Sequence, residues 1–531
     1  MFVVASSLFD SCYRHFESNH GSNIRLGRKQ LVISSYQLPT ITSGVGDDSM
    51  IVRTFNRRRP IIKPTLNDDE YHALVETESL YAPSAFIRLL TTYFRPASGA
   101  GLHVGHGQYF DFDHISSKLL GVAGLNSSYA SQVYGGGKGL DLHDMYVSSM
   151  GEGIERVLGS FAFLSWADRL QNGTRREMED RGKHCLGPED LPIFSEAQFS
   201  DPHFGFDRWD DNTTMGWIPG TRLYSGETIW VPAQLVLFIY YRPDDEPLIG
   251  LAPSGGLASH ITTDRAVYHA LDELIERDAV NLRWHARVPL DRIVMDVEPR
   301  DAKVRRHLSE LDRGIGKPEF YLQNLDFFEF PVLTAIEFDN WLEDLRYNAG
   351  GGVGASPDAA MRSALGEYCQ SERSLRICQL ADNWQFEIAF RRLFGIRADA
   401  KPYEFDRFVQ AITFYGYQQN QKKADWYFNG GGEVKLSELY ARCDAAEPDP
   451  VKRIHLAMQS RGIDPIMFDF TPRAFTQTKV WKAFIPELSQ PYPPQAPALG
   501  HPWYLNCPVD AGYRDHPIDQ ADLLQDPLPY P

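Results

Sequence analysis

The sequence predicts an α+β fold made of similar units, each with a strand, a glycine-rich turn and a polar helix. Three observations lead to this prediction. A pattern of polar residues with helical spacing occurs twice and has a weaker third copy. Each copy follows a glycine-rich stretch, and short runs rich in β-branched and aromatic residues, typical of strands, occur along the same part of the chain. We expect these pseudo-symmetric units to pack around one central site.

The repeated pattern places two glutamates and an arginine on one stripe of a helix. Its members are Ser148, Glu152, Glu155 and Arg156 in the first copy and His269, Glu273, Glu276 and Arg277 in the second. Residues at i, i+4, i+7 and i+8 share the side of a helix that ordinarily carries core leucines. A solvated face with intrahelical ion pairs is the alternative interpretation. Two copies in the same register, each after glycines, favour a shared site.

The third copy is weaker. It begins at Ser363 and continues with Glu367 and Gln370, after three glycines at 350–352 that we expect to form a turn. A helix is predicted over 358–376, because Pro357 suits the first turn of a helix.

Four glutamates on facing helices cannot all stay ionised together without cations. Carboxylate oxygens suit Mg²⁺, which usually binds a few carboxylates together with substrate phosphates. Arginines on the same stripes would then bind the phosphates. The pattern therefore predicts a Mg²⁺–nucleotide site whose metal ligands are Glu152, Glu155, Glu273 and Glu276.

Lys138 lies in the glycine run 135–139, ahead of the first copy. This run is not a Walker A loop, because Gly139 stands where Ser or Thr should follow the lysine. Backbone N–H groups of a glycine turn before a helix can still approach a phosphate. Lys138 either adds a charge there or is an exposed surface lysine.

These motifs resemble the YcaO family. The resemblance rests on the runs 137–156 and 254–278, and by spacing it extends over most of residues 100–490. The family binds ATP and Mg²⁺ without a P-loop and activates peptide-backbone amides by phosphorylation. The resemblance implies a YcaO-like fold of sheet and helix units around a central ATP site. The nucleotide contacts that we expect, besides the two Glu/Arg stripes, are Lys138, Ser148, His269, Arg362, Glu367 and Gln370.

The third copy departs from the family pattern. YcaO proteins usually have an arginine four residues before the glutamate, where this chain has Ser363. Arg362 is offset by one residue, which rotates a helical side chain by ~100°. Its contact with the phosphates is left open.

The last residues give a second, independent signal. The sequence ends Pro527-Leu528-Pro529-Tyr530-Pro531, which predicts either a disordered proline tail or a stiff polyproline II arm of ~15 Å. Such an arm can hold a terminal carboxylate in a site as a base. The ending resembles that of the azoline-forming branch of the family, whose C-terminal carboxylate lies in the active site.

The resemblance implies an ATP-dependent peptide cyclodehydratase with Pro531 as its base. Such an enzyme converts Cys, Ser or Thr of a ribosomal precursor peptide to thiazoline or oxazoline. Thioamidation, macroamidine formation and a non-catalytic scaffold role are the alternatives. No segment resembles the ThiF-type domain that often recognises the leader peptide, so we expect a separate ThiF-like partner protein to deliver the substrate. Homodimer formation is left open.

Composition excludes several other classes of protein. The net charge of −17 argues against a nucleic-acid partner. The six cysteines are scattered, with no Cys-x-x-Cys pair, which fits neither a zinc ribbon nor a small disulfide scaffold. We expect a soluble, cytoplasmic protein, because the sequence shows neither a signal peptide nor a membrane span.

We expect three parts in the chain: an N-terminal region of unassigned role (1–100), an ATP-binding catalytic domain (101–490) and a proline-rich tail (491–531). Five His and Asp residues between 103 and 114 are interpreted as a polar loop rather than a metal site, because their spacing matches no metal motif. Strands are predicted at 31–36, 50–55, 228–232, 235–241, 293–297, 330–338, 466–472 and 480–486. One or two helices are predicted over 68–94, and further helices at 402–414, 436–443 and 450–461. The first repeat helix is expected to reach residue 166 and beyond, and the second to continue to 284.

Overall fold

The computed structural model describes most of the chain after residue 65, within one compact unit that begins at Leu66. The described residues are 66–77, 80, 136–311, 317–338, 347–380, 395–405, 408–490 and 492–530, with the backbone alone for 87–93, 103–109 and 373–380. The strands predicted before residue 60 lie outside this set, as do Asp111, Asp113, His114 and Pro531.

The first sheet is antiparallel, in the order β1-β2-β3, and α2 precedes it in the chain. Its strands are β1 (Ile87–Tyr93), β2 (His103–Tyr109) and β3 (Lys138–Gly139), and α2 spans Asp68–Thr77. A capping box starts α2: the Asn67 N–H donates to Glu70 Oε2 and the Glu70 N–H donates to Asn67 Oδ1, both at 2.9 Å. The helical prediction over 68–94 is right for 68–77 and wrong for 87–93, where β-branched and aromatic residues form β1.

The second sheet has the order β4-β5-β13-β14-β7, with β6 paired to β5. Its strands are β4 (Gln171–Gly173), β5 (Met215–Arg222), β6 (Thr228–Pro232), β7 (Leu257–His260), β13 (Ile466–Asp469) and β14 (Lys479–Phe484). The predicted strand over 235–241 is wrong. A 3₁₀ turn (η4, Ala233–Leu235) follows Pro232, and the Leu237 N–H bonds back to the Ala233 carbonyl at 2.9 Å instead of to a neighbouring strand.

The third sheet has the order β11-β10-β9-β8-β12, with only β12 parallel to its neighbour. Its strands are β8 (Asp291–Val294), β9 (Glu319–Leu322), β10 (Val332–Phe338), β11 (Tyr347–Val353) and β12 (Glu433–Lys435). The glycine run 350–352, predicted as a turn, lies inside β11.

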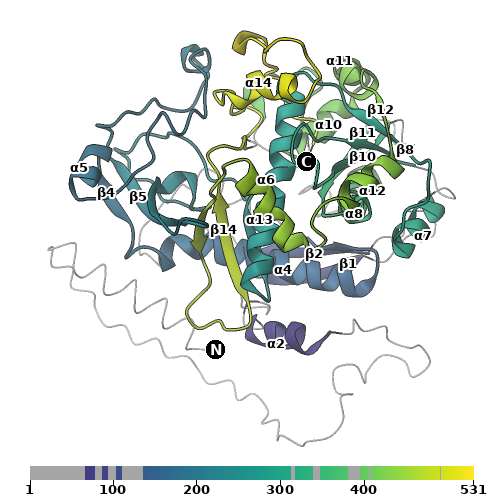
Figure 1. Ribbon diagram of the computed structural model, residues 1–531, viewed down its shortest axis with the longest axis horizontal. Coiled ribbons are helices and arrows are strands. Elements are labelled where there is room, and N and C mark those ends of the chain that lie inside the picture. The colour runs from purple at the N-terminus through teal and green to yellow at the C-terminus, as the bar shows by residue number, and fades with distance from the viewer. Residues whose placement is uncertain are drawn as a thin grey trace, which may run out of the picture. The chain divides into compact units, whose positions relative to one another are not determined.

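Three long helices carry the three copies of the polar pattern (Figure 1). They are α4 (Leu142–Ser165), α6 (Thr263–His285) and α8 (Pro357–Leu380). The second ends within one residue of its predicted end, whereas the first ends at Ser165 and does not continue beyond residue 166 as predicted. The other helices are α5 (Arg175–Asp180), α7 (Ala302–Leu311), α10 (Gln410–Gly416), α11 (Gln418–Asn429), α12 (Leu436–Asp444), α13 (Pro450–Ser460) and α14 (Trp503–Asp510), with short 3₁₀ turns η3 (Gln198–Ser200), η5 (Pro402–Glu404) and η6 (Gln520–Asp522). None of the described helices has the length and apolar character needed to cross a bilayer.

Glycines allow two of these helices to lie directly on strand backbone. A Cβ atom on Gly350 would stand 2.0 Å from the backbone nitrogen of Tyr368 in α8, and one on Gly352 would be almost as close to the same helix. Before α4, a Cβ on Gly137 would stand 2.0 Å from the backbone nitrogen of Ser149. The helices therefore pack against the bare backbone at these glycines. The glycine run 350–352 serves this packing within β11 and does not form a turn.

The tail between Leu523 and Tyr530 is bound along the C-terminal end of α6. His285 Nδ1 donates to the Leu524 carbonyl at 2.6 Å, and Trp284 Nε1 donates to the Asp526 carbonyl at 2.9 Å. Hydroxyls from α10 and β11 bind two further tail carbonyls: Tyr415 binds Pro527 at 2.7 Å, and Tyr347 binds Pro529 at 2.5 Å. Four side-chain donors thus bind carbonyls of the described part of the tail, which is not a free proline tail.

The buried His285 makes stability depend on pH. Burial lowers its pKa from 6.5 to about 4, so the folded protein binds this proton less readily than the unfolded chain. Its contribution to the free energy of unfolding is complete above pH 6.5 and is lost as the pH falls towards 4, with a slope of at most about 1.4 kcal/mol per pH unit. Urea denaturation at pH 7.5 and at pH 5 measures this effect. Between these two pH values, the free energy of unfolding is expected to fall less in His285→Gln than in the wild type. Equal losses in the two proteins would contradict this assignment.

Candidate functional site

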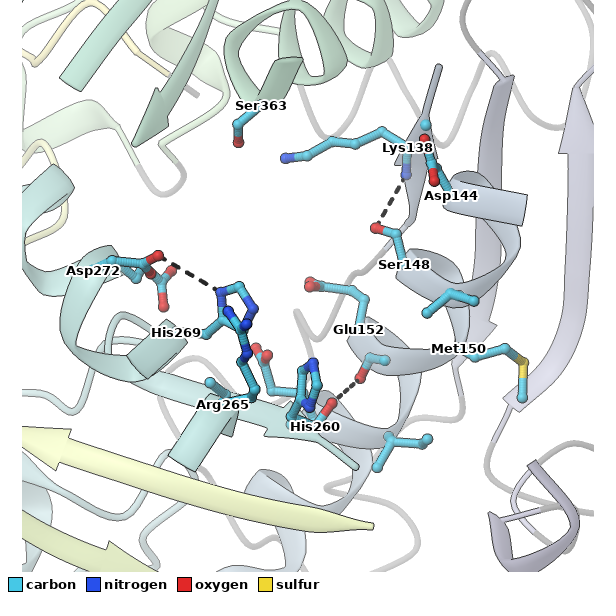
Figure 2. A pocket seen from close by; sticks show the side chains of 18 of the residues that line it. Lys138, Asp144, Ser148, Met150, Glu152, His260, Arg265, His269, Asp272 and Ser363 are labelled. Atoms are coloured by element: carbon cyan, nitrogen blue, oxygen red, sulfur yellow. Dashed lines mark hydrogen bonds and ion pairs between the residues drawn. The ribbon is translucent and has the colours of Figure 1, made fainter. Parts of the chain in front are cut away.

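The polar stripes of α4 and α6 line one cavity of about 1190 Å³, shown in Figure 2. Its walls also include residues of α2, β3, β7, β11, α8 and α13. Every described residue of the predicted site lines this cavity: Lys138, Ser148, Glu152, Glu155, Arg156, His269, Glu273, Glu276, Arg277, Arg362, Glu367 and Gln370. The structure therefore brings the three copies of the pattern together, as their shared register predicts.

Each arginine of the twin stripes pairs with glutamates of its own helix. Arg156 lies 2.8 Å from Glu152 and 4.0 Å from Glu155. In α6, Arg277 lies 3.6 Å from Glu273 and 4.0 Å from the second glutamate of its stripe. The same intrahelical pairing recurs in both units, so the alternative interpretation based on ion pairs is correct about the pairs but not about exposure to solvent.

The third helix contributes a pair that links distant segments. Lys138 Nζ lies 2.7 Å from Glu367 Oε1, and Figure 2 shows the lysine reaching from β3 towards Ser363. Its side chain crosses α8 at Gly366, where a Cβ atom would stand 2.8 Å from Lys138 Cγ. Lys138 is thus directed into the cavity and is not a free surface lysine.

Burial leaves the carboxylates of the twin stripes short of positive charge. Burial raises the pKa of Glu155 well above its usual range, and the negative charge of the neighbouring Glu152 raises it further. Burial likewise raises the pKa of Glu273. Burial also raises the pKa of Glu276, to about 7. Burial acts in the same direction on Glu367, but Lys138 and Arg277 outweigh it and lower the pKa of that carboxylate. The twin stripes hold excess negative charge that a bound cation would compensate.

Glu276 also has an open position beside it. Its Oε1 atom is buried and accepts no hydrogen bond from any residue that the structure describes. Gly351 faces this oxygen, and a Cβ atom there would stand only 2.8 Å away. This oxygen has no donor, and Gly351 opposite it carries no side chain. Both features fit a Mg²⁺ ion, for which carboxylate oxygens are the preferred ligands.

In each unit a backbone N–H of the strand before the helix, or of the turn that leads into that strand, donates to a side chain of the stripe. The Gly256 N–H donates to Glu273 Oε2 at 3.0 Å, and the Gly351 N–H donates to Glu367 Oε2 at 3.1 Å. In the first unit the acceptor is Ser148 Oγ, which receives the Lys138 N–H at 3.3 Å. These bonds orient the stripes, and sequence reasoning did not anticipate them.

Sequence reasoning also missed Lys482 of β14. This side chain is 3% exposed, and its Nζ donates to the carbonyls of Pro253 at 2.7 Å and Gly255 at 2.5 Å. Burial lowers the pKa of Lys482 to about 8, although Glu273 and Glu155 oppose that shift. The sequence did contain a signal for this burial. Lys482 comes two residues after the apolar Val480 in a predicted strand, and alternate residues of a strand share a face.

Histidines form one flank of the cavity. His269 Nδ1 lies 3.6 Å from Asp272 Oδ2, and its ring stacks on His260 with centroids 5.6 Å apart (Figure 2). Burial lowers the pKa of His260 to about 4. Burial acts in the same direction on His269, but Asp272 outweighs it and raises the pKa of His269. His260 was not predicted as a site residue.

Two predicted contacts are engaged with protein groups. Arg362 is ion-paired with Asp301 and its side chain is 43% exposed. Gln370 Nε2 donates to the Gly136 carbonyl at 3.2 Å. Their roles towards a nucleotide stay predictions.

Comparison with known families identifies this arrangement. A family model described as "YcaO cyclodehydratase, ATP- and Mg²⁺-binding" matches residues 136–489, more than half of the chain. The chain belongs to the YcaO family. The matched segment contains α4, α6 and α8, so all three polar helices of this YcaO protein lie in the region that defines the family.

Curated relatives match over shorter stretches. An uncharacterised protein of Methanothermobacter thermautotrophicus is 28% identical over 163 residues, which cover 30% of this chain and 42% of that protein. An uncharacterised Mycobacterium tuberculosis protein is 28% identical over 158 residues, 30% of this chain and 35% of that protein. The chain thus spans less than half the length of either relative.

Solved structures share the α+β fold. A heterocyclase in complex with substrate and cofactor superposes with a TM-score of 0.65 at 17% identity, covering 87% of this chain and 57% of that one. YcaO from Methanopyrus kandleri, bound with AMPPCP and Mg²⁺, gives 0.53 at 16% identity, covering 80% and 92%. The Escherichia coli microcin synthetase complex gives 0.51 at 13% identity, covering 83% and 96%.

Two neighbouring glycines of β11 provide a matched test of the packing. Gly350→Ala places a methyl group against the backbone of α8, so we expect the free energy of unfolding to fall by about 1–3 kcal/mol or more. Gly351→Ala meets the flexible end of Glu276 instead, and we expect a loss below about 1 kcal/mol. Chemical denaturation of both variants measures this difference, and equal stability would show that α8 does not lie on the β11 backbone.

Proposed function

We propose that this YcaO protein is an ATP- and Mg²⁺-dependent cyclodehydratase of peptides. The observation that carries the proposal is the convergence of the two Glu-x-x-Glu-Arg stripes on one cavity, with Glu276 Oε1 lacking a donor. The family model that matches the chain is described by the same activity and the same ligands, which supports the assignment.

The residues present suit a Mg²⁺–ATP complex. Glu152, Glu155, Glu273 and Glu276 would hold the metal, which when bound neutralises charge on the phosphates. The groups assigned to the nucleotide itself are Lys138, Ser148, Arg156, His269, Arg277, Arg362, Glu367 and Gln370. Arg156 and Arg277 can bind phosphate oxygens because guanidinium groups match them bidentately.

The proposed reaction removes one water from the peptide for each ring. A Cys, Ser or Thr side chain attacks the carbonyl carbon of the preceding amide and closes a five-membered ring, a step favoured by proximity. The former carbonyl oxygen takes the γ-phosphoryl group of ATP, and ADP leaves. A base then removes the amide proton and phosphate departs, which leaves a thiazoline or oxazoline. Phosphorylation by ATP turns this oxygen into a phosphate, which leaves much more readily than hydroxide.

Pro531 is our candidate for this base, through its carboxylate. The residue lies outside the described part of the chain, but its neighbour Tyr530 is buried. Gln323 Nε2 donates to the Tyr530 hydroxyl and, at 2.8 Å, to Thr334 Oγ1.

Thr334 in turn pairs with Gly351 across β10 and β11, so both residues face the same side of the sheet. Gly351 borders Glu276 on that side. The tail therefore reaches the sheet face next to the carboxylates, which supports a base delivered from this end.

The substrate in this proposal is a ribosomal precursor peptide, brought by a separate ThiF-like partner that binds its leader. The Escherichia coli microcin synthetase, whose fold this chain shares, was solved as a complex with its precursor bound. That precedent supports a peptide substrate and a partner protein here.

Removal of a metal-site carboxylate tests the nucleotide assignment. Glu276→Gln keeps the size of the side chain but removes its charge, and we expect the affinity for Mg²⁺–AMPPCP to fall about 10- to 100-fold. Isothermal titration calorimetry measures this, with Glu298→Gln as the control because the Glu298 side chain is 89% exposed. Equal affinity in wild type and Glu276→Gln would refute the metal site.

Altering the C-terminus tests the base. Deleting Pro531, or extending the chain beyond it, should reduce the rate of water loss from a Cys/Ser-rich precursor peptide by about 10²–10⁴-fold, while Mg²⁺–AMPPCP binding persists. Mass spectrometry of the peptide, with the partner protein present, measures the rate. An N-terminal extension of equal length is the control. A wild-type product with a different mass change would instead indicate thioamidation or macroamidine formation.

A further inference from the structure

Helix α2 forms a wall of the cavity although it precedes the family-defining residues 136–489. Its two faces differ in exposure. On the opposite face Tyr71 is 56% exposed and Val75 50% exposed. The residues that line the cavity, spaced i, i+3, i+4 and i+7 along one side, are Glu70, Ala73, Leu74 and Thr77, with Leu66 before them.

Glu76 attaches α2 to the turn between β13 and β14. Its carboxylate accepts the backbone N–H groups of three successive residues: Thr476, Gln477 at 3.1 Å and Thr478 at 2.7 Å. Burial opposes ionisation of Glu76, but these three donors outweigh it and lower its pKa. Thr478 also lines the cavity, so the attachment lies at its edge.

Glu70 attaches α2 to α4. Its Oε2 atom lies 3.1 Å from His143 Nε2, and the same oxygen caps α2 through the Asn67 N–H. The helix that carries Ser148 and the first glutamate stripe is thus joined to α2 one turn before that stripe begins. Both attachments come from charged side chains, whereas the face between them is largely apolar.

We propose that α2 covers the base and ribose of the bound nucleotide, an inference that rests on the proposed function. The carboxylates and arginines occupy the phosphate end of the cavity. A nucleobase has apolar faces and binds best between apolar side chains. Such groups line the cavity where α2 faces α4: Ala73 and Leu74 on α2, and Val147 and Met150 on α4.

The other flank, at β7 and α6, has polar side chains beside apolar ones such as Ile261 and Tyr268. It carries His260, Arg265, His269 and Asp272, which suit a peptide backbone or phosphate better than a base. The base therefore takes the side of α2. Because α2 then contacts the nucleotide, its docking and nucleotide binding stabilise each other.

Two substitutions on α2 and one control test this inference. Leu74→Asp puts a charge on the cavity face, and Glu76→Ala removes the attachment to the β13–β14 turn. We expect each to raise the Kd for Mg²⁺–AMPPCP about tenfold or more, because Leu74→Asp removes apolar contacts and Glu76→Ala removes hydrogen bonds to a charged group. Val75→Ser, on the exposed face of the same helix, should change the Kd less than about twofold.

Inorganic tripolyphosphate separates base contacts from phosphate contacts. Its Kd with Mg²⁺ should be the same in wild type, Leu74→Asp and Glu76→Ala, because it lacks a base and a ribose. In the wild type, AMPPCP but not tripolyphosphate should slow amide hydrogen exchange in α2, a result that needs no variant to fold.

The outcomes distinguish the two proposals. If the wild type binds neither AMPPCP nor tripolyphosphate, the proposed function fails. If the wild type binds AMPPCP but the α2 variants bind it equally well and α2 exchange is unchanged, the function stands and the role of α2 is overturned. Equal weakening of both ligands would also overturn it, because α2 would then act on the phosphate end.

Discussion

The site depends on helices that lie directly on the backbone of the strand before them. At Gly350 in β11 and at Gly137, directly before β3, no side chain separates this backbone from the helix, so the polar stripes of α8 and α4 are held at a fixed depth beside it. Backbone N–H groups also reach the stripes: the Gly351 N–H of β11 reaches Glu367, and the Gly256 N–H, in the turn before β7, reaches Glu273. Orientation of the carboxylates is therefore built into the backbone of helices and strands, which hold a site more precisely than loops do.

This arrangement costs stability. Buried carboxylates with raised pKa values destabilise the folded state unless a positive charge compensates them. Removing one partner of a buried ion pair lowers stability further, because the other charge stays buried and unpaired. Arg156 and Arg277 supply part of the compensation within their own helices, and Lys482 approaches from β14. Stability is given up here for electrostatic preorganisation, the usual pattern at catalytic sites.

The sequence was informative where the signal is local. Helical spacing predicted that the stripes of α4 and α6 share one site, and the start of α2 was predicted at residue 68, where the structure has it. Local signals failed where packing decides. The run at Gly350 became a strand because α8 needs its bare backbone, and 235–241 became irregular after Pro232. Partners far apart in sequence, such as Lys138 and Glu367, leave no local trace and required the structure.

The intrahelical pair of Arg156 with Glu152 has a consequence for how ligands enter. On the proposed function, an arginine that binds a phosphate gives up its ion pair with the glutamate, and that carboxylate then needs a new counterion. A metal ion that arrives with the phosphate fills this need at once, whereas either ion alone would leave a charge unmatched. The exchange of partners makes the entry of anion and cation mutually dependent, so that the cavity selects the neutralised complex over its separate components.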